Sequence, residues 1–357
     1  MRAKLAENTL TSLAKAFQSP WYDNIDRRLI KSGELKKLFD NGLLGVTSNP
    51  TIFEKAVSAS DIYDRDIKAL SQKGKNALEI YDILTMKDVS DAADLLRETY
   101  EKTNHLDGYV SIEVLPEFAH NAEKTARSAR EIFKNIAKPN IMIKVPGTKE
   151  APGAIRALTR EGINVNVTLL FSVKHYETCA RAYIDGLTDR IKEGKGIKNV
   201  FSVASVFISR VDTKLDKLFE EKKIEDLRGE IAVANAKMIY RKFKELDFKG
   251  GNAQRVLWAS TSAKNPSYRD VKYVEELIGA ETINTMPPQT VDAFLDHGKV
   301  EFTVEKGLDT AEANLAKLRS LGINLDEICQ EIQDAGVQAF QNSFNKLIHS
   351  IEQKLPS

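Results

Sequence analysis

The chain has few cysteines, no dominant charge and no long hydrophobic run. Its 357 residues include two cysteines, Cys179 and Cys329, too few for a disulfide scaffold and typical of a reducing cytosol. The 52 basic and 51 acidic residues give a formal net charge of +1, which does not favour binding to nucleic acid or membranes. No apolar run approaches the length of a membrane span, and the N-terminus lacks the apolar segment of a signal peptide. We therefore expect a cytoplasmic protein.

Histidine is also scarce, with five residues scattered along the sequence. No histidine and cysteine cluster has metal-ligand spacing, so the sequence predicts no metal site. Proline- or serine-rich linkers, low-complexity tracts and shifts in composition are absent as well. We therefore expect one domain spanning residues 1–357, a length that α/β barrels reach as single units.

Short apolar segments with the composition of strands alternate with longer amphipathic segments. Eight strand segments can be identified: Trp21–Asp23, Leu43–Asn49, Gly108–Leu115, Asn140–Pro146, Asn164–Phe171, Val200–Ile208, Arg255–Thr261 and Glu281–Pro287. Segments with helical periodicity separate them, the clearest being Asp88–Asn104, Phe118–Lys138, Val173–Glu193, Asp212–Leu246 and Ser267–Leu277. Repeated βα units predict a parallel sheet, and eight units predict an α/β fold of the (β/α)8 TIM-barrel type.

Some helical segments lie outside this repeat. One is expected at Asp61–Gln72, in the long connection between the second and third strands. Two more, Thr310–Leu321 and Leu325–Lys354, follow the eighth strand. The sequence therefore predicts a barrel with additional N- and C-terminal helices, the last two of which pack across it.

The fourth strand segment carries a charge where the pattern is apolar. Aliphatic residues at 141, 143 and 145 share one face of this strand, and Lys144 points to the other. A protonated lysine is costly inside a covered parallel sheet, so the amine either meets an anion or loses its proton. A neutral, desolvated lysine amine is the nucleophile that forms Schiff bases with carbonyl substrates. The structural alternative is a strand-end lysine that reaches solvent.

Neighbouring strands place polar side chains on one face, near their C-terminal ends. These are Thr47 and Asn49, Ser111 and Glu113, and Asn164, Asn166 and Thr168. Active sites of (β/α)8 barrels lie at that end, so we expect a glutamate, two asparagines and a threonine among these side chains to converge with the lysine on one cavity. An ammonium and a carboxylate would there control each other's ionisation.

Each of these residues also has a purely structural interpretation. Glu113 is then an ion-pair partner of Lys144, Asn49 opens a turn, and Asn166 and Thr168 cap the following helix. Their common face and common end favour the functional interpretation.

Three of these segments resemble those of transaldolases. They are Gly45–Phe53 (GVTSNPTIF), Ile143–Thr148 (IKVPGT) and Gly162–Ser172 (GINVNVTLLFS). The resemblance extends from about Trp21 to Gly298, and the segments Trp21–Asp23 and Asn284–Pro287 are similar to the longer bacterial subgroup. It implies a (β/α)8 barrel that transfers a dihydroxyacetone unit from a ketose phosphate to an aldose phosphate in the non-oxidative pentose phosphate pathway.

The resemblance also implies catalytic roles. Lys144 resembles the lysine that attacks the C2 carbonyl of the ketose. Asp23 would exchange the proton of the C4 hydroxyl, with the nearby Asp26 as the alternative. Glu113 and Thr168 would hold the water that moves protons during Schiff-base formation and hydrolysis. The iminium then serves as the electron sink, so no metal or cofactor is implied.

Substrate contacts follow from the same resemblance. Asn49 and Asn166 would bind hydroxyls of the three-carbon unit. The segment Ser205–Arg210 resembles one whose serine and arginine contact phosphate, and Lys264 stands where shorter members have an arginine. Phe207 shares the parity of Ser205, at a place where related aldolases have a tyrosine that assists proton transfer.

Two other functions remain open. A lysine-dependent sugar-phosphate aldolase would share Lys144 and Glu113 but would need no acceptor. A non-catalytic barrel that binds phosphosugars belongs to a different class and would lack a catalytic group, whereas all four candidate groups are present. The sequence leaves both a monomer and a homodimer open.

Overall fold

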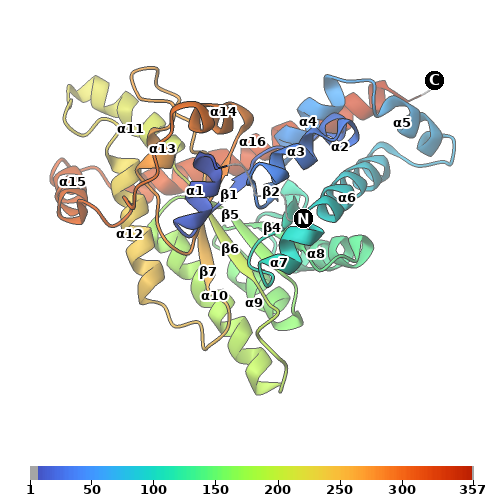
Figure 1. Ribbon diagram of the computed structural model, residues 1–357, viewed down its shortest axis with the longest axis horizontal. Helices are drawn as coiled ribbons and strands as arrows, with labels where there is room; N and C mark the ends of the chain where they lie inside the picture. The colour runs from blue at the N-terminus through green and yellow to red at the C-terminus, as the bar shows by residue number, and fades with distance from the viewer. Residues whose placement is uncertain (1–6, 356–357) are drawn as a thin grey trace.

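The computed structural model describes residues 7–355, which are built around a closed barrel of eight parallel strands (Figure 1). Each strand pairs with its neighbours in the chain, and the last pairs with the first. The strands are β1 (Gln18–Tyr22), β2 (Val46–Thr47), β3 (Val110–Glu113), β4 (Ile141–Pro146), β5 (Val165–Leu170), β6 (Ser202–Phe207), β7 (Gln254–Ala259) and β8 (Thr282–Met286). Every segment that the sequence marks as a strand overlaps one of them, so the predicted (β/α)8 barrel is confirmed.

Helices form the layer outside the strands. They are α1 (Thr9–Lys15), α2 (Arg27–Ser32), α3 (Glu34–Asp40), α4 (Pro50–Ser58), α5 (Asp64–Ser71), α6 (Ala77–Leu95), α7 (Arg97–Lys102), η1 (Pro116–Phe118), α8 (Ala122–Ile136), α9 (Ala151–Glu161), α10 (Val173–Lys192), α11 (Ser209–Lys222), α12 (Ile231–Glu245), α13 (Lys272–Glu275), α14 (Pro288–His297), α15 (Leu308–Ser320) and α16 (Leu325–Gln353). No helix within residues 7–355 is both long enough and apolar enough to span a bilayer.

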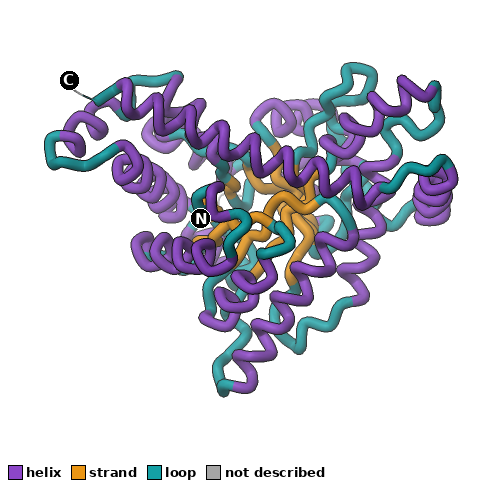
Figure 2. Tube along the Cα trace, turned by 180° about the vertical axis from the view of Figure 1, so that it is seen from behind, coloured by secondary structure: helices purple, strands orange, loops and turns teal. Residues whose placement is uncertain are grey.

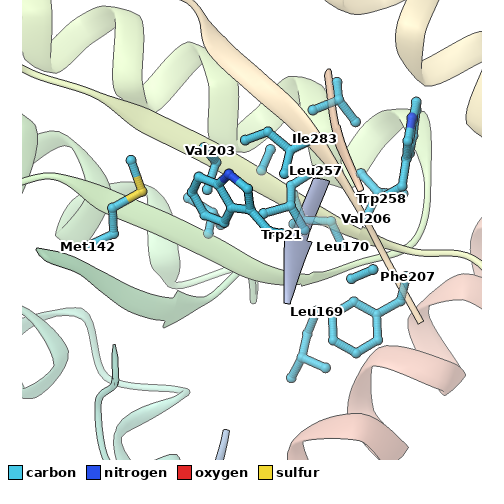
Figure 3. Close-up of a cluster of buried hydrophobic side chains, with 14 of the residues drawn as sticks. Trp21, Met142, Leu169, Leu170, Val203, Val206, Phe207, Leu257, Trp258 and Ile283 are labelled. Atoms are coloured by element: carbon cyan, nitrogen blue, oxygen red, sulfur yellow. The ribbon is translucent and has the colours of Figure 1, made fainter. Parts of the chain in front are cut away.

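The middle of the barrel is filled by apolar side chains rather than by a channel. Figure 3 shows Trp21, Val203, Leu257 and Ile283 gathered between the strands, all of them almost completely buried. Gly45 leaves room for the indole, because a Cβ at this position would lie 2.5 Å from the Trp21 ring. The packed middle separates the two ends of the barrel, so a site at one end is closed from the other.

A buried ion pair occupies the N-terminal end of the barrel. Arg255 Nη2 lies 3.0 Å from Asp107 Oδ1, and both side chains are nearly inaccessible. Trp21 Nε1 and Ser19 Oγ donate to the same carboxylate at 2.9 and 2.8 Å. These donors compensate the Asp107 carboxylate for its burial. Removing either charge of the pair would leave the other charge buried without a partner. These contacts connect β1, β7 and the loop before β3.

The additional helices predicted from the sequence are present as α5, α15 and α16. The last of these crosses the barrel at the ends of the strands (Figure 2). Gln333 Nε2 donates to the carbonyl oxygens of Gly147 and Leu169, at 2.9 and 2.8 Å. At the far end of the helix, Lys354 Nζ donates to the Ser60 carbonyl at 2.8 Å. The prediction that C-terminal helices pack across the barrel is confirmed for α16.

Two predicted helices are divided. The segment Asp88–Asn104 contains the end of α6 and all of α7, which meet at Leu96. The segment Asp212–Leu246 contains α11 and α12, separated by a loop in which Lys223 and Gly229 have φ values of 56° and 70°. Left-handed residues end a helix, and glycine adopts this conformation without steric cost. Amphipathic periodicity continues across the loop, which is why it gives no indication of the break.

Candidate active site at the C-terminal end of the barrel

The lysine and glutamate predicted to meet lie on adjacent strands at the same register. Glu113 of β3 pairs with Lys144 of β4, and Lys144 Nζ lies 3.8 Å from Glu113 Oε2. Both side chains are buried, and Nζ also donates to the Ser48 carbonyl at 3.0 Å. Burial raises the pKa of Glu113 to about 7, although the positive charge of Lys144 opposes this rise. The carboxyl group is therefore poised to give or take a proton near neutral pH.

A second carboxylate follows β1. Asp23 Oδ1 accepts a hydrogen bond from Thr47 Oγ1 at 2.7 Å, and Thr47 in turn contacts Thr285 Oγ1 at 2.7 Å. Burial raises the pKa of Asp23, whereas the charges of Lys144, Arg210 and the more distant Lys264 lower it. The site thus contains two carboxyl groups in different surroundings, an arrangement that allows different proton-transfer roles.

Asp26, the alternative to Asp23, has a structural function. Its Oδ1 accepts from the backbone N–H of Arg28 at 2.7 Å, which makes it the N-cap of α2. Its other oxygen pairs with the Arg28 guanidinium at 2.5 Å. Both carboxylate oxygens are engaged in these contacts, so the geometry favours Asp23 as the group free to act on a substrate.

A row of hydrogen-bonded polar groups lies next to the lysine. Asn166 of β5 pairs with Lys144 in the strand register and is fully buried. Its Nδ2 donates to Ser111 Oγ at 3.0 Å, and its Oδ1 accepts from Ser205 Oγ at 2.6 Å. The row fixes the orientation of the asparagine amide. Thr168, farther along β5, is also inaccessible.

Three buried oxygens beside this row lack a hydrogen-bond partner among the described residues. They are both carboxylate oxygens of Glu113 and the hydroxyl oxygen of Thr168. Buried polar atoms are usually satisfied, and a small polar molecule bound between such groups is the common solution. The glutamate and threonine to which the family resemblance assigns a shared water are therefore the groups with unused hydrogen-bonding capacity.

Asn49 has both a structural role and a place in the site. Its Oδ1 caps α4 by accepting from the Ile52 N–H at 3.0 Å, whereas the structural interpretation is that it opens a turn. Its side chain also lines the cavity into which Lys144 projects. The cap fixes the amide, so its Nδ2 group is held in place for a ligand.

Three cations, Lys55, Arg210 and Lys264, line this cavity without a carboxylate partner among residues 7–355. Arg210 begins α11, and its guanidinium carbon lies 5.2 Å from the centre of the Phe207 ring. Lys264 Nζ donates to Ser262 Oγ at 2.7 Å. Burial lowers the pKa of Lys264, and the charges of Arg210 and Lys55 lower it further. Cations that repel each other in a partly buried place form a site for an anion, and phosphate is the multivalent anion that such pairs bind.

Most of these groups line one cavity of about 560 Å³ at the C-terminal ends of the strands. Of the residues predicted from the sequence, it is lined by Asp23, Asn49, Lys144, Ser205, Phe207, Arg210 and Lys264. Glu113, Asn166 and Thr168 are buried close to Lys144 and do not line it. The structure therefore brings all ten predicted residues to one end of the barrel.

Other lining residues were not identified from the sequence. Ser262 lies two residues before Lys264, so this proximity was the available signal. Lys55 projects from α4, and Phe340 comes from α16, far away in the sequence. No periodicity or motif connects α16 to the site, because only the tertiary fold brings it there. Within the described part of the chain, no group of histidine, cysteine and acidic side chains forms a metal site.

Comparisons with known proteins agree with this geometry. Residues 20–351 match the sequence family described as "Transaldolase/Fructose-6-phosphate aldolase". The chain is 43% identical over 374 residues to a protein named "Transaldolase" from Trichodesmium erythraeum, with 98% of each chain covered. It is 42% identical to "Transaldolase 2" from Nostoc punctiforme, again with 98% of each covered, and 40% identical to "Transaldolase" from Mycobacterium bovis, with 95% of each covered.

Proposed function

We propose a reaction course for this chain, which belongs to the transaldolase/fructose-6-phosphate aldolase family and is a transaldolase. It moves a dihydroxyacetone unit from a ketose phosphate, such as fructose 6-phosphate or sedoheptulose 7-phosphate, to an aldose phosphate, such as erythrose 4-phosphate or glyceraldehyde 3-phosphate. The step belongs to the non-oxidative pentose phosphate pathway. The observation that supports the reaction course is the buried lysine beside a carboxyl group with a pKa of about 7. The adjoining cavity also contains the carboxylate of Asp23 and cations that have no ion-pair partner among the described residues.

Lys144 is the nucleophile in this proposal. Its neutral amine attacks the C2 carbonyl of the ketose and forms a carbinolamine. Protonated Glu113 then gives its proton to the departing hydroxyl through a water held with Thr168, and the water lost leaves a protonated iminium. The spare hydrogen-bonding capacity of Glu113 and Thr168 supports this role, since that water would satisfy both groups.

Asp23 acts in the carbon–carbon cleavage. As a carboxylate it accepts the proton of the C4 hydroxyl, the bond between C3 and C4 breaks, and its electron pair moves into the iminium to give an enamine. The aldose phosphate leaves, and the acceptor aldehyde then takes its place. The reverse sequence forms the new bond, with Asp23 returning the proton to the new hydroxyl. Hydrolysis of the Schiff base then uses Glu113 as the base. The hydrogen bond from Thr47 to Asp23 supports a fixed orientation for this carboxylate.

Asn49 and Asn166 hold the hydroxyls of the three-carbon unit. Both amides are fixed by other contacts, one as a helix cap and one between two serines. Fixed amides hold the covalent intermediate in one orientation while the acceptor enters, which lowers the entropic cost of the second half-reaction.

Arg210 and Lys264 bind the phosphate of donor and acceptor. Arginine offers a planar fork and lysine a point charge, and both serve phosphate. Ser262 orients Lys264, and Ser205 lies deeper, donating to Asn166. Both cysteines are free and buried, which supports our further proposal of a cytoplasmic setting.

A coupled assay with and without an acceptor tests this function. With fructose 6-phosphate alone, a transaldolase releases about one glyceraldehyde 3-phosphate per active site, because the enamine stays on the lysine. Erythrose 4-phosphate then converts this single release into steady turnover. Continuous release without an acceptor would instead identify a lysine-dependent aldolase, the other activity in the family's description.

A further inference from the structure

The C-terminal helix α16 is fixed directly to the strands that carry the catalytic groups. Gln333 is buried, and its Nε2 bridges the carbonyl oxygens of Gly147 and Leu169. Gly147 directly follows β4, and Leu169 lies in β5 at a register shift, with a φ of 59°. These two hydrogen bonds set the height of the helix above the barrel.

One turn further along the same face, α16 contacts the phosphate-binding side of the cavity at a glycine. A Cβ added to Gly336 would lie 3.0 Å from Leu169 Cδ2 and 3.3 Å from Arg210 Nη1. Both distances are shorter than ordinary contacts between a methyl group and its neighbours. In Figure 3, Leu169 and Phe207 lie beside the pale red ribbon of this helix. The guanidinium thus occupies space that any other residue at position 336 would fill.

Arg210 has no salt bridge in the part of the chain that the structure describes. Its guanidinium lies over the Phe207 ring on one side, and Gly336 of α16 lies close to Nη1. Its position is therefore set by packing rather than by a carboxylate. A carboxylate would hold the guanidinium equally well but would cancel the charge that attracts phosphate.

Glycine is an unusual residue at position 336. It lies in the interior of a helix of 29 residues, where alanine is strongly favoured over glycine. Its φ is not in the left-handed region, so the backbone does not require glycine. The physical requirement that remains is the absence of a side chain.

We propose that Gly336 is a positioning residue that fixes the place of the Arg210 guanidinium and thereby sets the affinity for the phosphorylated end of the sugar. This inference rests on the proposed function, since it assumes that Arg210 binds the phosphate of the donor. Phosphate selection is then built partly from the C-terminal helix, through the contact of Gly336 with the Arg210 guanidinium.

The test compares Gly336→Ala with the wild-type enzyme, using trapping of the Lys144 Schiff base by borohydride. Fructose 6-phosphate is the probe with phosphate, and dihydroxyacetone is the probe without it. We expect the half-saturating concentration of fructose 6-phosphate to rise about tenfold, as for a weakened charge-assisted hydrogen bond. The value for dihydroxyacetone should change by less than about twofold, because a Cβ at position 336 meets Leu169 and Arg210 rather than Lys144 or Asn49. Inhibition by inorganic phosphate should weaken in parallel with fructose 6-phosphate binding.

Ala339→Val is the matched control, because it adds side-chain volume to the exposed face of the same helix. It should leave both probes unchanged. A Gly336→Ala enzyme with unchanged fructose 6-phosphate binding, or with equal losses for both probes, would overturn the proposal. If Gly336→Ala does not fold, the double variant Gly336→Ala/Leu169→Ala removes the closer contact and keeps the one to Arg210, with the same expectations. Failure of the proposed phosphate site is distinguishable, since Arg210→Met would then bind fructose 6-phosphate as tightly as the wild-type enzyme does.

Discussion

Lys144 Nζ lies 3.8 Å from Glu113 Oε2, across the register of two adjacent barrel strands. At this distance the groups influence each other's charge without forming a tight ion pair, so the carboxyl keeps a pKa of about 7 in spite of the lysine. A tighter pair would hold Glu113 ionised, and an ionised carboxyl cannot donate the proton that dehydration of the carbinolamine needs.

The raised pKa of Glu113 predicts a pH dependence of stability. A carboxyl whose pKa rises from 4.5 to about 7 on folding binds more protons in the native state between these values. The free energy of unfolding should therefore fall as pH rises from about 4.5 to 7, by about 1.4 kcal/mol per pKa unit at most. In Glu113→Gln this component of the pH dependence should be absent. Urea denaturation at several pH values from 4.5 to 8 measures both proteins, and identical profiles would contradict the raised pKa.

The same substitution should affect catalysis. Glutamine keeps the shape but transfers no proton, so kcat of Glu113→Gln should fall about 10²- to 10⁴-fold. Formation of the borohydride-trapped adduct should slow in parallel, because Glu113 acts in dehydration of the carbinolamine. Stopped-flow trapping measures this step. Normal trapping with slow turnover would assign Glu113 to a later step.

Asp23 and Asp26 should differ sharply. Asp23→Asn should reduce transfer about 10²- to 10⁴-fold while keeping trapping with dihydroxyacetone, because only the carbon–carbon step needs its carboxylate. Asp26→Asn should keep most of kcat and lower the free energy of unfolding by about 1 kcal/mol or less, since asparagine also caps helices but does not pair with Arg28. Activity assays and thermal unfolding of both variants show which aspartate acts in catalysis and which stabilises the helix. A large loss of kcat in Asp26→Asn would instead assign the catalytic role to Asp26.

Phe207→Tyr should alter the balance between transfer and cleavage. The ring lines the cavity beneath the Arg210 guanidinium, so a phenolic hydroxyl there can deliver a proton to the enamine. The ratio of acceptor-independent release to transfer should rise about tenfold or more. Phe340→Tyr is the control, because it places a hydroxyl in the same cavity from α16. An unchanged ratio in Phe207→Tyr, or an equal rise in both variants, would refute the role of this position.

Lys264→Met should raise KM for fructose 6-phosphate about tenfold or more, because a hydrogen bond between charged groups is lost. Lys264→Arg should stay within a few-fold of the wild-type value, since arginine also binds phosphate. The melting temperature of Lys264→Met should not fall, because its removal relieves repulsion with Arg210. Steady-state kinetics across the three enzymes gives the comparison. Equal KM values in the three enzymes would show that Lys264 does not bind the phosphate.

Much of this fold is predictable because its pattern is local. Strand composition, parity and βα repetition identify all eight strands, and they place Glu113 and Lys144 on the inner face. The single-domain interpretation stays a prediction of the same kind.

Other features depend on contacts distant in sequence. The break between α11 and α12 has left-handed residues that amphipathic periodicity does not indicate. The double role of Asn49, as helix cap and cavity wall, needs the position of α4. The contact of Gly336 with Arg210 joins residues 126 positions apart, so only the structure shows it.

Borohydride reduction in the presence of fructose 6-phosphate, followed by peptide mapping, tests the central claim most directly. The account predicts a stable secondary amine on Lys144, formed in the wild-type enzyme and absent from Lys144→Met. Lys264, the other lysine in the cavity with a proposed role, should remain unmodified. An adduct on a different lysine, or an active enzyme that forms no adduct, would contradict the account.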